Sequence, residues 1–168
     1  MDRMTPEQRH RCMSRIRSKD TKPEQVVRRM LHALGFRFRL HAKHLPGNPD
    51  IVLPRHKKVI FVHGCFWHSH GCRVGGKTPT TNEPFWETKF SRNIARDKVA
   101  IKQLWQTGWQ VLVVWECEAL DPDKLHETLT AFMATSTAPD YEAIAEQSSF
   151  YGMAAEASEP YGSDGITE

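Results

Sequence analysis

The stretch "KVIFVHGCFWHSHGC", residues 58–72, joins a buried strand to a loop rich in ligand-type side chains. Its first seven residues, 58–64, are mostly β-branched or aromatic, which is typical of a strand buried on both faces. The ten residues from His63 to Cys72 then hold three histidines, two cysteines and two bulky aromatics. Neither a core nor an ordinary surface needs that density. The stretch therefore predicts a sheet with a functional loop at one strand end.

The sequence on either side predicts helices that flank this sheet. Thr21 is a suitable N-cap, Pro23 fits the first turn and Gly35 ends the pattern, so residues 21–35 predict a helix. Strands are expected at 36–41, 49–54, 58–64 and 109–117, and further helices at 84–107 and from Asp121. An antiparallel meander followed by a helical crossover gives a mixed α/β sheet flanked by helices.

Composition limits the class of protein. The 168 residues are 39% hydrophobic and 26% charged, values ordinary for a globular domain that needs no disulfides. No apolar run is long enough to cross a membrane, and the N-terminal residues do not resemble a secretory signal. We expect a cytoplasmic protein, where a Cys/His cluster more often binds metal than forms disulfides.

Charge divides the chain into three parts. Residues 1–60 hold 15 Lys/Arg and 5 Asp/Glu, a balance of +10, whereas residues 121–168 hold 1 and 10, a balance of −9. A positive N-terminal third suits a phosphate backbone, although such gradients also occur in proteins that bind no nucleic acid. We expect a basic arm at 1–22, a folded domain at 23–136 and an acidic, flexible tail at 137–168.

The cysteines predict a structural zinc site. Cys65 and Cys72 lie in the loop after one predicted strand, and Cys117 closes another, so all three could converge. One histidine would complete a tetrahedral set, but His68 and His70 are both candidates. The alternative is that these are unrelated buried cysteines, which we favour only for Cys12.

Asp50 and His63 predict a second, catalytic site. They lie thirteen residues apart, which fits neighbouring antiparallel strands whose ends meet. A carboxylate there could hold Mg²⁺, and an imidazole could take a proton from water. Glu24, in the first helical turn, could instead complement the helix dipole.

Four segments, "LPGNPDIVLP", "VIFVHGCFWHSHGC", "FWETKFSRNIARD" and "GWQVLVVWEC", resemble the bacterial very-short-patch mismatch repair endonuclease family. The resemblance covers about residues 8–120. It implies a restriction-endonuclease-like core and Mg²⁺-dependent nicking of duplex DNA 5′ of the thymine in a T·G mismatch left by deamination of 5-methylcytosine.

The resemblance also assigns site residues. Asp50 would be the main Mg²⁺ ligand, His63 and His68 would serve phosphoryl chemistry with His68 as general base, and Glu24 would act through the metal's water shell. Zinc would take Cys65, His70, Cys72 and Cys117. Val62 stands where the family commonly has Thr, which changes little if that position binds Mg²⁺ through its main-chain carbonyl. The lysine and second acid of many related nucleases are absent.

The aromatic residues would read the DNA. Phe66, Trp67 and Trp86 resemble residues that wedge into the base stack, where a poorly paired step is cheapest to open. Met13 would enter the opposite groove. Trp86, Lys89 and Asn93 share one helical sector, although Trp86 could equally be core.

Two alternatives remain from the sequence. One is a restriction-type nuclease of the same fold, and the other is a non-catalytic zinc-bound module that recognises distorted DNA. We expect a monomer, because a T·G pair is asymmetric, with the acidic tail as a candidate contact for repair partners.

Overall fold

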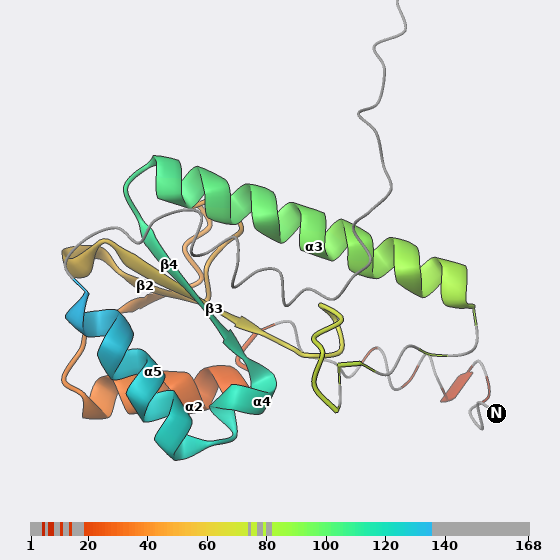
Figure 1. Cartoon of the computed structure of the whole chain (residues 1–168), viewed down its shortest axis with the longest axis horizontal. Coiled ribbons are helices and arrows are strands. Elements are labelled where there is room, and N and C mark those ends of the chain that lie inside the picture. The colour runs from red at the N-terminus through yellow and green to blue at the C-terminus, as the bar shows by residue number, and fades with distance from the viewer. Residues whose placement is uncertain are drawn as a thin grey trace, which may run out of the picture.

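The computed structural model describes residues 5, 7–8, 11, 14, 19–73, 75–76, 79 and 82–135. Met13, Cys12 and the predicted acidic tail lie outside these residues. The main elements, labelled as in Figure 1, are α2 (Lys22–Ala33), β1 (Arg39–Leu40), β2 (Ile51–Leu53), the 3₁₀ turn η1 (Pro54–His56), β3 (Lys58–His63), α3 (Glu83–Gln106), β4 (Gln110–Trp115), α4 (Glu116–Ala119) and α5 (Pro122–Ala134).

The four strands form one mixed sheet in the order β1-β2-β3-β4. Antiparallel pairing joins β1 to β2 and β2 to β3, whereas β3 and β4 run parallel because α3 carries the chain back between them. This confirms the predicted meander and helical crossover. In the described residues, every helix is too short or too polar to cross a lipid bilayer.

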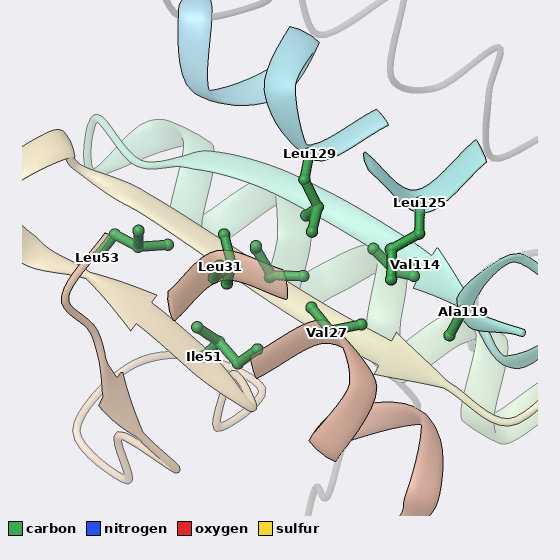
Figure 2. Close-up of a cluster of buried hydrophobic side chains, with 9 residues drawn as sticks. Val27, Leu31, Ile51, Leu53, Val114, Ala119, Leu125 and Leu129 are labelled. Atoms are coloured by element: carbon green, nitrogen blue, oxygen red, sulfur yellow. The ribbon is translucent and has the colours of Figure 1, made fainter. Parts of the chain in front are cut away.

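Helices cover both faces of the sheet (Figure 1). On one face, α2, α4 and α5 pack on alternate strand residues, and Figure 2 shows Val27, Leu31, Leu125 and Leu129 directed at β2 and β4. On the other, Ile101 and Leu104 of α3 pack on the intervening residues. Burial on both faces explains why the strands are continuously apolar.

The ends of α2 follow the sequence signals. Thr21 and Glu24 form a capping box, in which the Thr21 hydroxyl accepts from the Glu24 N–H and the Glu24 carboxylate accepts from the Thr21 N–H. Gly35, at φ +86°, adopts the left-handed conformation that ends the helix.

All four predicted strands were too long: the one expected at 49–54 covers only Ile51–Leu53, and the one expected at 58–64 ends one residue early. The strand expected at 36–41 pairs only at Arg39–Leu40, and His41 turns away at φ +48°. The strand expected at 109–117 ends at Trp115, because the Glu118 carboxylate accepts the Trp115 N–H at 3.1 Å and starts α4. Cys117 therefore lies on a short helix and not on the strand.

Candidate active site and metal centre

The parallel pairing of β3 with β4 fixes the site. His63 and Trp115 are the last residues of these strands and are paired in register. Cys65 and Cys117 each follow that pair by two residues, so they leave the same edge of the sheet together. The Cys117 N–H donates to the Cys65 Sγ at 3.4 Å. The sheet thus positions two predicted zinc ligands.

The four predicted zinc ligands come together. One ligand atom from each of Cys65, His70, Cys72 and Cys117 lies within 4.8 Å of the others. The His70 Nδ1 is 3.6 Å from the Cys117 Sγ, and the His70 ring stacks on Trp115 with centroids 4.1 Å apart. His70 therefore fits the fourth position, and His68 belongs to a different cluster.

The donor chemistry of this cluster fits a metal cation. Burial raises the pKa of Cys65 to about 12 and raises that of Cys117 as well, and Cys72 adds to both shifts, although the Cys65 thiol acts in the opposite direction on Cys117. Burial also lowers the pKa of His70, so its ring is neutral and able to bind metal. Three crowded thiols are costly to ionise unless a cation compensates them, and Cys₃His is a common zinc set.

Asp50 lies immediately before β2, with its carboxylate turned toward β3. Its Oδ2 accepts the Val62 N–H at 2.8 Å. Burial, with a contribution from the negative charge of Glu24, raises the pKa of Asp50 to about 6, against the opposing effect of the Val62 N–H. The nearest recorded basic side chain is His41, whose Nδ1 lies 4.0 Å from Oδ1. Few positive charges offset this buried carboxylate, and the main chain of Val62 lies beside it. The site therefore suits a divalent cation that prefers oxygen ligands.

The two remaining loop histidines form a stacked pair. The rings of His63 and His68 are 4.0 Å apart and within 2° of parallel. Burial, followed by the charge of His68, lowers the pKa of His63 to about 3, so its ring is neutral near pH 7. The rings of Trp115 and His63 meet edge to face, with centroids 5.6 Å apart. Because Trp115 also stacks on His70, it connects the histidine pair to the four predicted zinc ligands.

Asp97 of α3 completes this pair and was missed in the sequence. Its Oδ2 lies 2.7 Å from the His68 Nδ1, and both atoms are buried. Burial alone would raise the pKa of Asp97, but its contact with His68 and the charge of Arg96 help to hold the pKa below its usual value. The signal was available, because Asp97 interrupts the apolar stripe between Ile94 and Ile101.

Two cavities meet at these residues. One, of about 1000 Å³, is lined by Asp50, His63, His68 and Asp97, and the other, of about 960 Å³, by Asp50, Glu24 and Trp67. The residues that line both are Asp50, Val62, His68 and Arg96. The cavities therefore form a groove with Asp50 and His68 at its middle, and the other two predicted catalytic residues, His63 and Glu24, line one cavity each.

Glu24 has structural partners as well as a place in this groove. Its side chain is 3% exposed, completes the cap of α2 and accepts from the Arg28 Nη2 at 2.7 Å. Arg28 also contacts Asp20 at 2.5 Å and the His41 Nε2 at 3.1 Å. The guanidinium thus compensates the Asp20–Glu24 pair, and these contacts support the capping interpretation of Glu24.

An aromatic surface adjoins the groove, made of Phe66, Trp67, Phe85 and Trp86, with the buried Phe90 beneath Phe66 and Trp86. The Lys89 Nζ lies 5.2 Å from the Trp67 ring and 5.9 Å from that of Trp86, and the Asn93 side chain donates to the Trp67 carbonyl at 2.9 Å. The predicted wedge residues and polar reader therefore do meet. Trp86 also packs on the buried Phe90, at 5.8 Å, so it has a structural role too.

Comparisons with known proteins identify relatives of this chain. The family described as "DNA mismatch endonuclease Vsr" matches residues 1–74. The type II nicking enzyme V.XorIIP of Xanthomonas oryzae pv. oryzae is 50% identical over 76% of this chain and 93% of its own length. The DNA mismatch endonuclease Vsr of Escherichia coli is 42% identical over 73% and 78%. The type II nicking enzyme V.NmeAIP of Neisseria meningitidis is 45% identical over 70% and 83%.

A solved structure supports the fold independently. The catalytic domain of the homing endonuclease I-Bth0305I superposes with a TM-score of 0.50 at 22% identity, over 70% of this chain and 98% of that domain. At that identity the likeness concerns the endonuclease-like fold alone. The family is shown by the sequence relatives: the chain belongs to the Vsr family of DNA mismatch and nicking endonucleases.

Proposed function

We propose that this protein is a Mg²⁺-dependent, zinc-stabilised endonuclease that nicks duplex DNA 5′ of the thymine in a T·G mismatch. Such mismatches arise when 5-methylcytosine is deaminated, and the nick would initiate very-short-patch repair. The observation that carries the proposal is the placement of Asp50 and the His68–Asp97 pair in one groove, beside an aromatic surface.

Asp50 and the main-chain carbonyl of Val62 would hold the catalytic Mg²⁺. A bound Mg²⁺ neutralises phosphate charge and makes its water easier to deprotonate. The proton of the attacking water would pass to His68, because Asp97 engages Nδ1 and leaves Nε2 to accept it. His63, stacked on His68, would hold the ring in plane and line the phosphate path. Glu24 would act from the second cavity.

The aromatic surface would select the mismatch. Opening a base step costs a few kcal/mol and least where pairing is already poor, so a wedge of Phe66, Trp67 and Trp86 favours a T·G pair. Lys89 and Asn93 lie against Trp67, where they could contact the displaced backbone or base edges. Met13 would approach from the other groove.

Zinc at Cys65, His70, Cys72 and Cys117 would be structural. It would tie the loop after β3 to the start of α4, and so hold Trp67 and His68 in place between two ligands. We propose that the protein acts as a cytoplasmic monomer on double-stranded DNA, with repair proteins as candidate partners of the acidic tail.

The test uses three matched duplexes with a labelled strand, containing T·G, T·A or C·G at one position, with Mg²⁺. We expect a nick 5′ of the thymine in the T·G duplex alone, lost in Asp50→Ala. The names of the type II nicking relatives favour a second candidate, strand-specific nicking of paired DNA, and equal cutting of T·G and C·G would support it. Tight binding of T·G without any nick would instead indicate a recognition module.

A further inference from the structure

Arg96 lies where the two halves of the groove meet. It lines both cavities, as do Asp50, Val62 and His68, and it is the cation among these four. Asp50 supplies a carboxylate, Val62 its main chain and His68 an imidazole. Lysines line only one cavity each, Lys19 and Lys43 the first and Lys22 and Lys89 the second, so a phosphate at the junction next to Asp50 would meet Arg96 from either side.

The helix α3 aims Arg96 at this junction. Lys89, Asn93, Arg96 and Gln103 follow helical spacing along one side of α3, and each lines the groove. Arg92, on the same stretch of helix, is exposed and lines neither cavity. Arg96 thus lies on the side of α3 that lines the groove, whereas Arg92 does not.

The contacts of Arg96 anchor it without covering it. Its Nη2 lies 3.5 Å from the Asp97 Oδ1, while the other oxygen of Asp97 contacts His68. The side chain remains 68% exposed. A guanidinium carries five N–H donors, so the contact with Asp97 leaves donors for an oxygen-rich group in the groove.

Phosphodiester hydrolysis needs such a group. Negative charge grows on the phosphate oxygens in the transition state, and Asp50 and Asp97 already place two carboxylates in the groove. The sequence has no lysine where many nucleases of this fold carry one. An arginine on α3 would supply the equivalent charge from a different element.

We propose that Arg96 is a further catalytic residue whose guanidinium binds a non-bridging oxygen of the scissile phosphate. The inference rests on the nicking activity proposed above, and its closest alternative is a solvated arginine that merely pairs with Asp97. Both alternatives keep Arg96 near Asp97, but only the catalytic one makes the rate of strand scission depend on the guanidinium.

The experiment compares Arg96→Ala, Arg96→Lys and Arg92→Ala with the wild type. Single-turnover nicking is measured with saturating enzyme, using whichever duplex the wild type nicks, and duplex affinity is measured without Mg²⁺. We expect Arg96→Ala to lower the rate about 100-fold, comparable to loss of one transition-state donor, while affinity changes only a few-fold. Arg96→Lys should recover part of the rate. Millimolar guanidinium should partly rescue Arg96→Ala.

The matched helix variant separates catalysis from general charge. Arg92→Ala removes the same charge from the same helix, so it should retain the wild-type rate at saturation and gain nothing from guanidinium. Equal rates for Arg96→Ala and Arg92→Ala, or an Arg96→Ala defect that guanidinium does not relieve, would overturn the proposal. A wild type that nicks a paired duplex would overturn the T·G assignment but leave this comparison intact.

Discussion

Asp50, the proposed Mg²⁺ ligand, illustrates how a buried carboxylate can oppose folding. Its carboxylate is 19% exposed, and burial raises its pKa to about 6. The folded protein therefore binds the proton more tightly than the unfolded chain does, and stability falls as pH rises from about 4 through about 6. Above that window the ionised form is a net cost, on the order of 2 kcal/mol.

Replacement of Asp50 should therefore stabilise the metal-free protein. We expect Asp50→Asn to raise the free energy of unfolding by roughly 1–2 kcal/mol at pH 7.5, measured by urea denaturation in buffer without added Mg²⁺ and without a chelator, which would also remove zinc. The gain should be lost near pH 4. Nicking should disappear. Saturating Mg²⁺ should stabilise the wild type and leave the variant unchanged.

Asp20, another carboxylate that lines the groove, provides the control for Asp50→Asn. Asp20 has its pKa lowered, chiefly by its hydrogen bond with Arg28, so Asp20→Asn should not stabilise the protein at pH 7.5. A destabilised Asp50→Asn variant at neutral pH would mean that the carboxylate is already compensated in the folded chain.

Asp97 belongs with His68 as a functional pair. Its carboxylate holds the His68 Nδ1 at 2.7 Å, so Asp97→Asn should free the ring to rotate or change tautomer. We expect the single-turnover nicking rate to fall roughly 100-fold or more, with duplex affinity nearly unchanged.

A double-variant cycle tests whether the two residues act together. His68→Gln and Asp97→Asn should each cause a large loss, and the double variant should lose little more than the worse single variant. Multiplicative losses would show that Asp97 acts on something other than His68.

At the scale of elements, the apolar patterns of β3, β4 and α3 were strong enough to predict both the sheet and its crossover. The capping residues of α2 were also readable, because Thr21, Glu24 and Gly35 act locally. The ends of the strands were less clear. The strand-like run 109–117 gives no clear sign that the strand ends at Trp115. It ends there because the Glu118 carboxylate accepts the Trp115 N–H, a contact that only the structure shows.

The site was predictable to the extent that its residues cluster in sequence. The loop at 63–72 could be recognised as a candidate site because histidines and cysteines are so frequent in it. Asp50 could be placed beside His63 because two neighbouring strands of a hairpin bring their ends together. The partners contributed by α2 and α3 were missed, since Arg28 and Asp97 look like ordinary helical charges. Their roles depend on which helix face packs near the loop, and that is a tertiary property.

The loop after β3 should depend on zinc for its order. Purified protein should contain one zinc per chain by metal analysis, and Cys117→Ser should lose it, lower the melting temperature and sharply reduce nicking. The reason is that Cys117 joins α4 to the loop that carries Trp67 and His68.

Cys12 is the control for this prediction. It lies outside the described residues and outside the predicted ligand set, so Cys12→Ser should retain both zinc and stability. Full zinc content in Cys117→Ser would mean that another residue completes the site.

For the whole molecule, charge is distributed in a way that should regulate DNA affinity. Residues 1–135 hold all 23 Lys/Arg and 13 of the 20 Asp/Glu, a balance of +10, whereas residues 136–168 hold the other seven acids and no Lys/Arg, a balance of −7. Both parts would experience the field of a nearby duplex, and their effects oppose each other.

Neutralising the acidic segment should therefore tighten DNA binding in a salt-dependent manner. The variant replaces its seven acids by the matching amides, at Asp140, Glu142, Glu146, Glu156, Glu159, Asp164 and Glu168. We expect several-fold tighter binding to a paired duplex at about 50 mM salt, shrinking toward no difference near 0.5 M as screening shortens the range of the repulsion.

A truncation after Thr135 distinguishes charge from bulk. It retains Thr135, whose hydroxyl and carbonyl accept hydrogen bonds from the buried Lys58, so the end of α5 keeps its contact with β3. If charge is responsible, the truncated and amide-substituted proteins should bind alike in a fluorescence anisotropy titration across the salt series. Tighter binding by the truncated protein alone, independent of salt, would show that the segment obstructs DNA by its volume.

Because nicking at a T·G site would require release from competing paired DNA, we expect the amide variant to turn over more slowly when excess paired duplex is present.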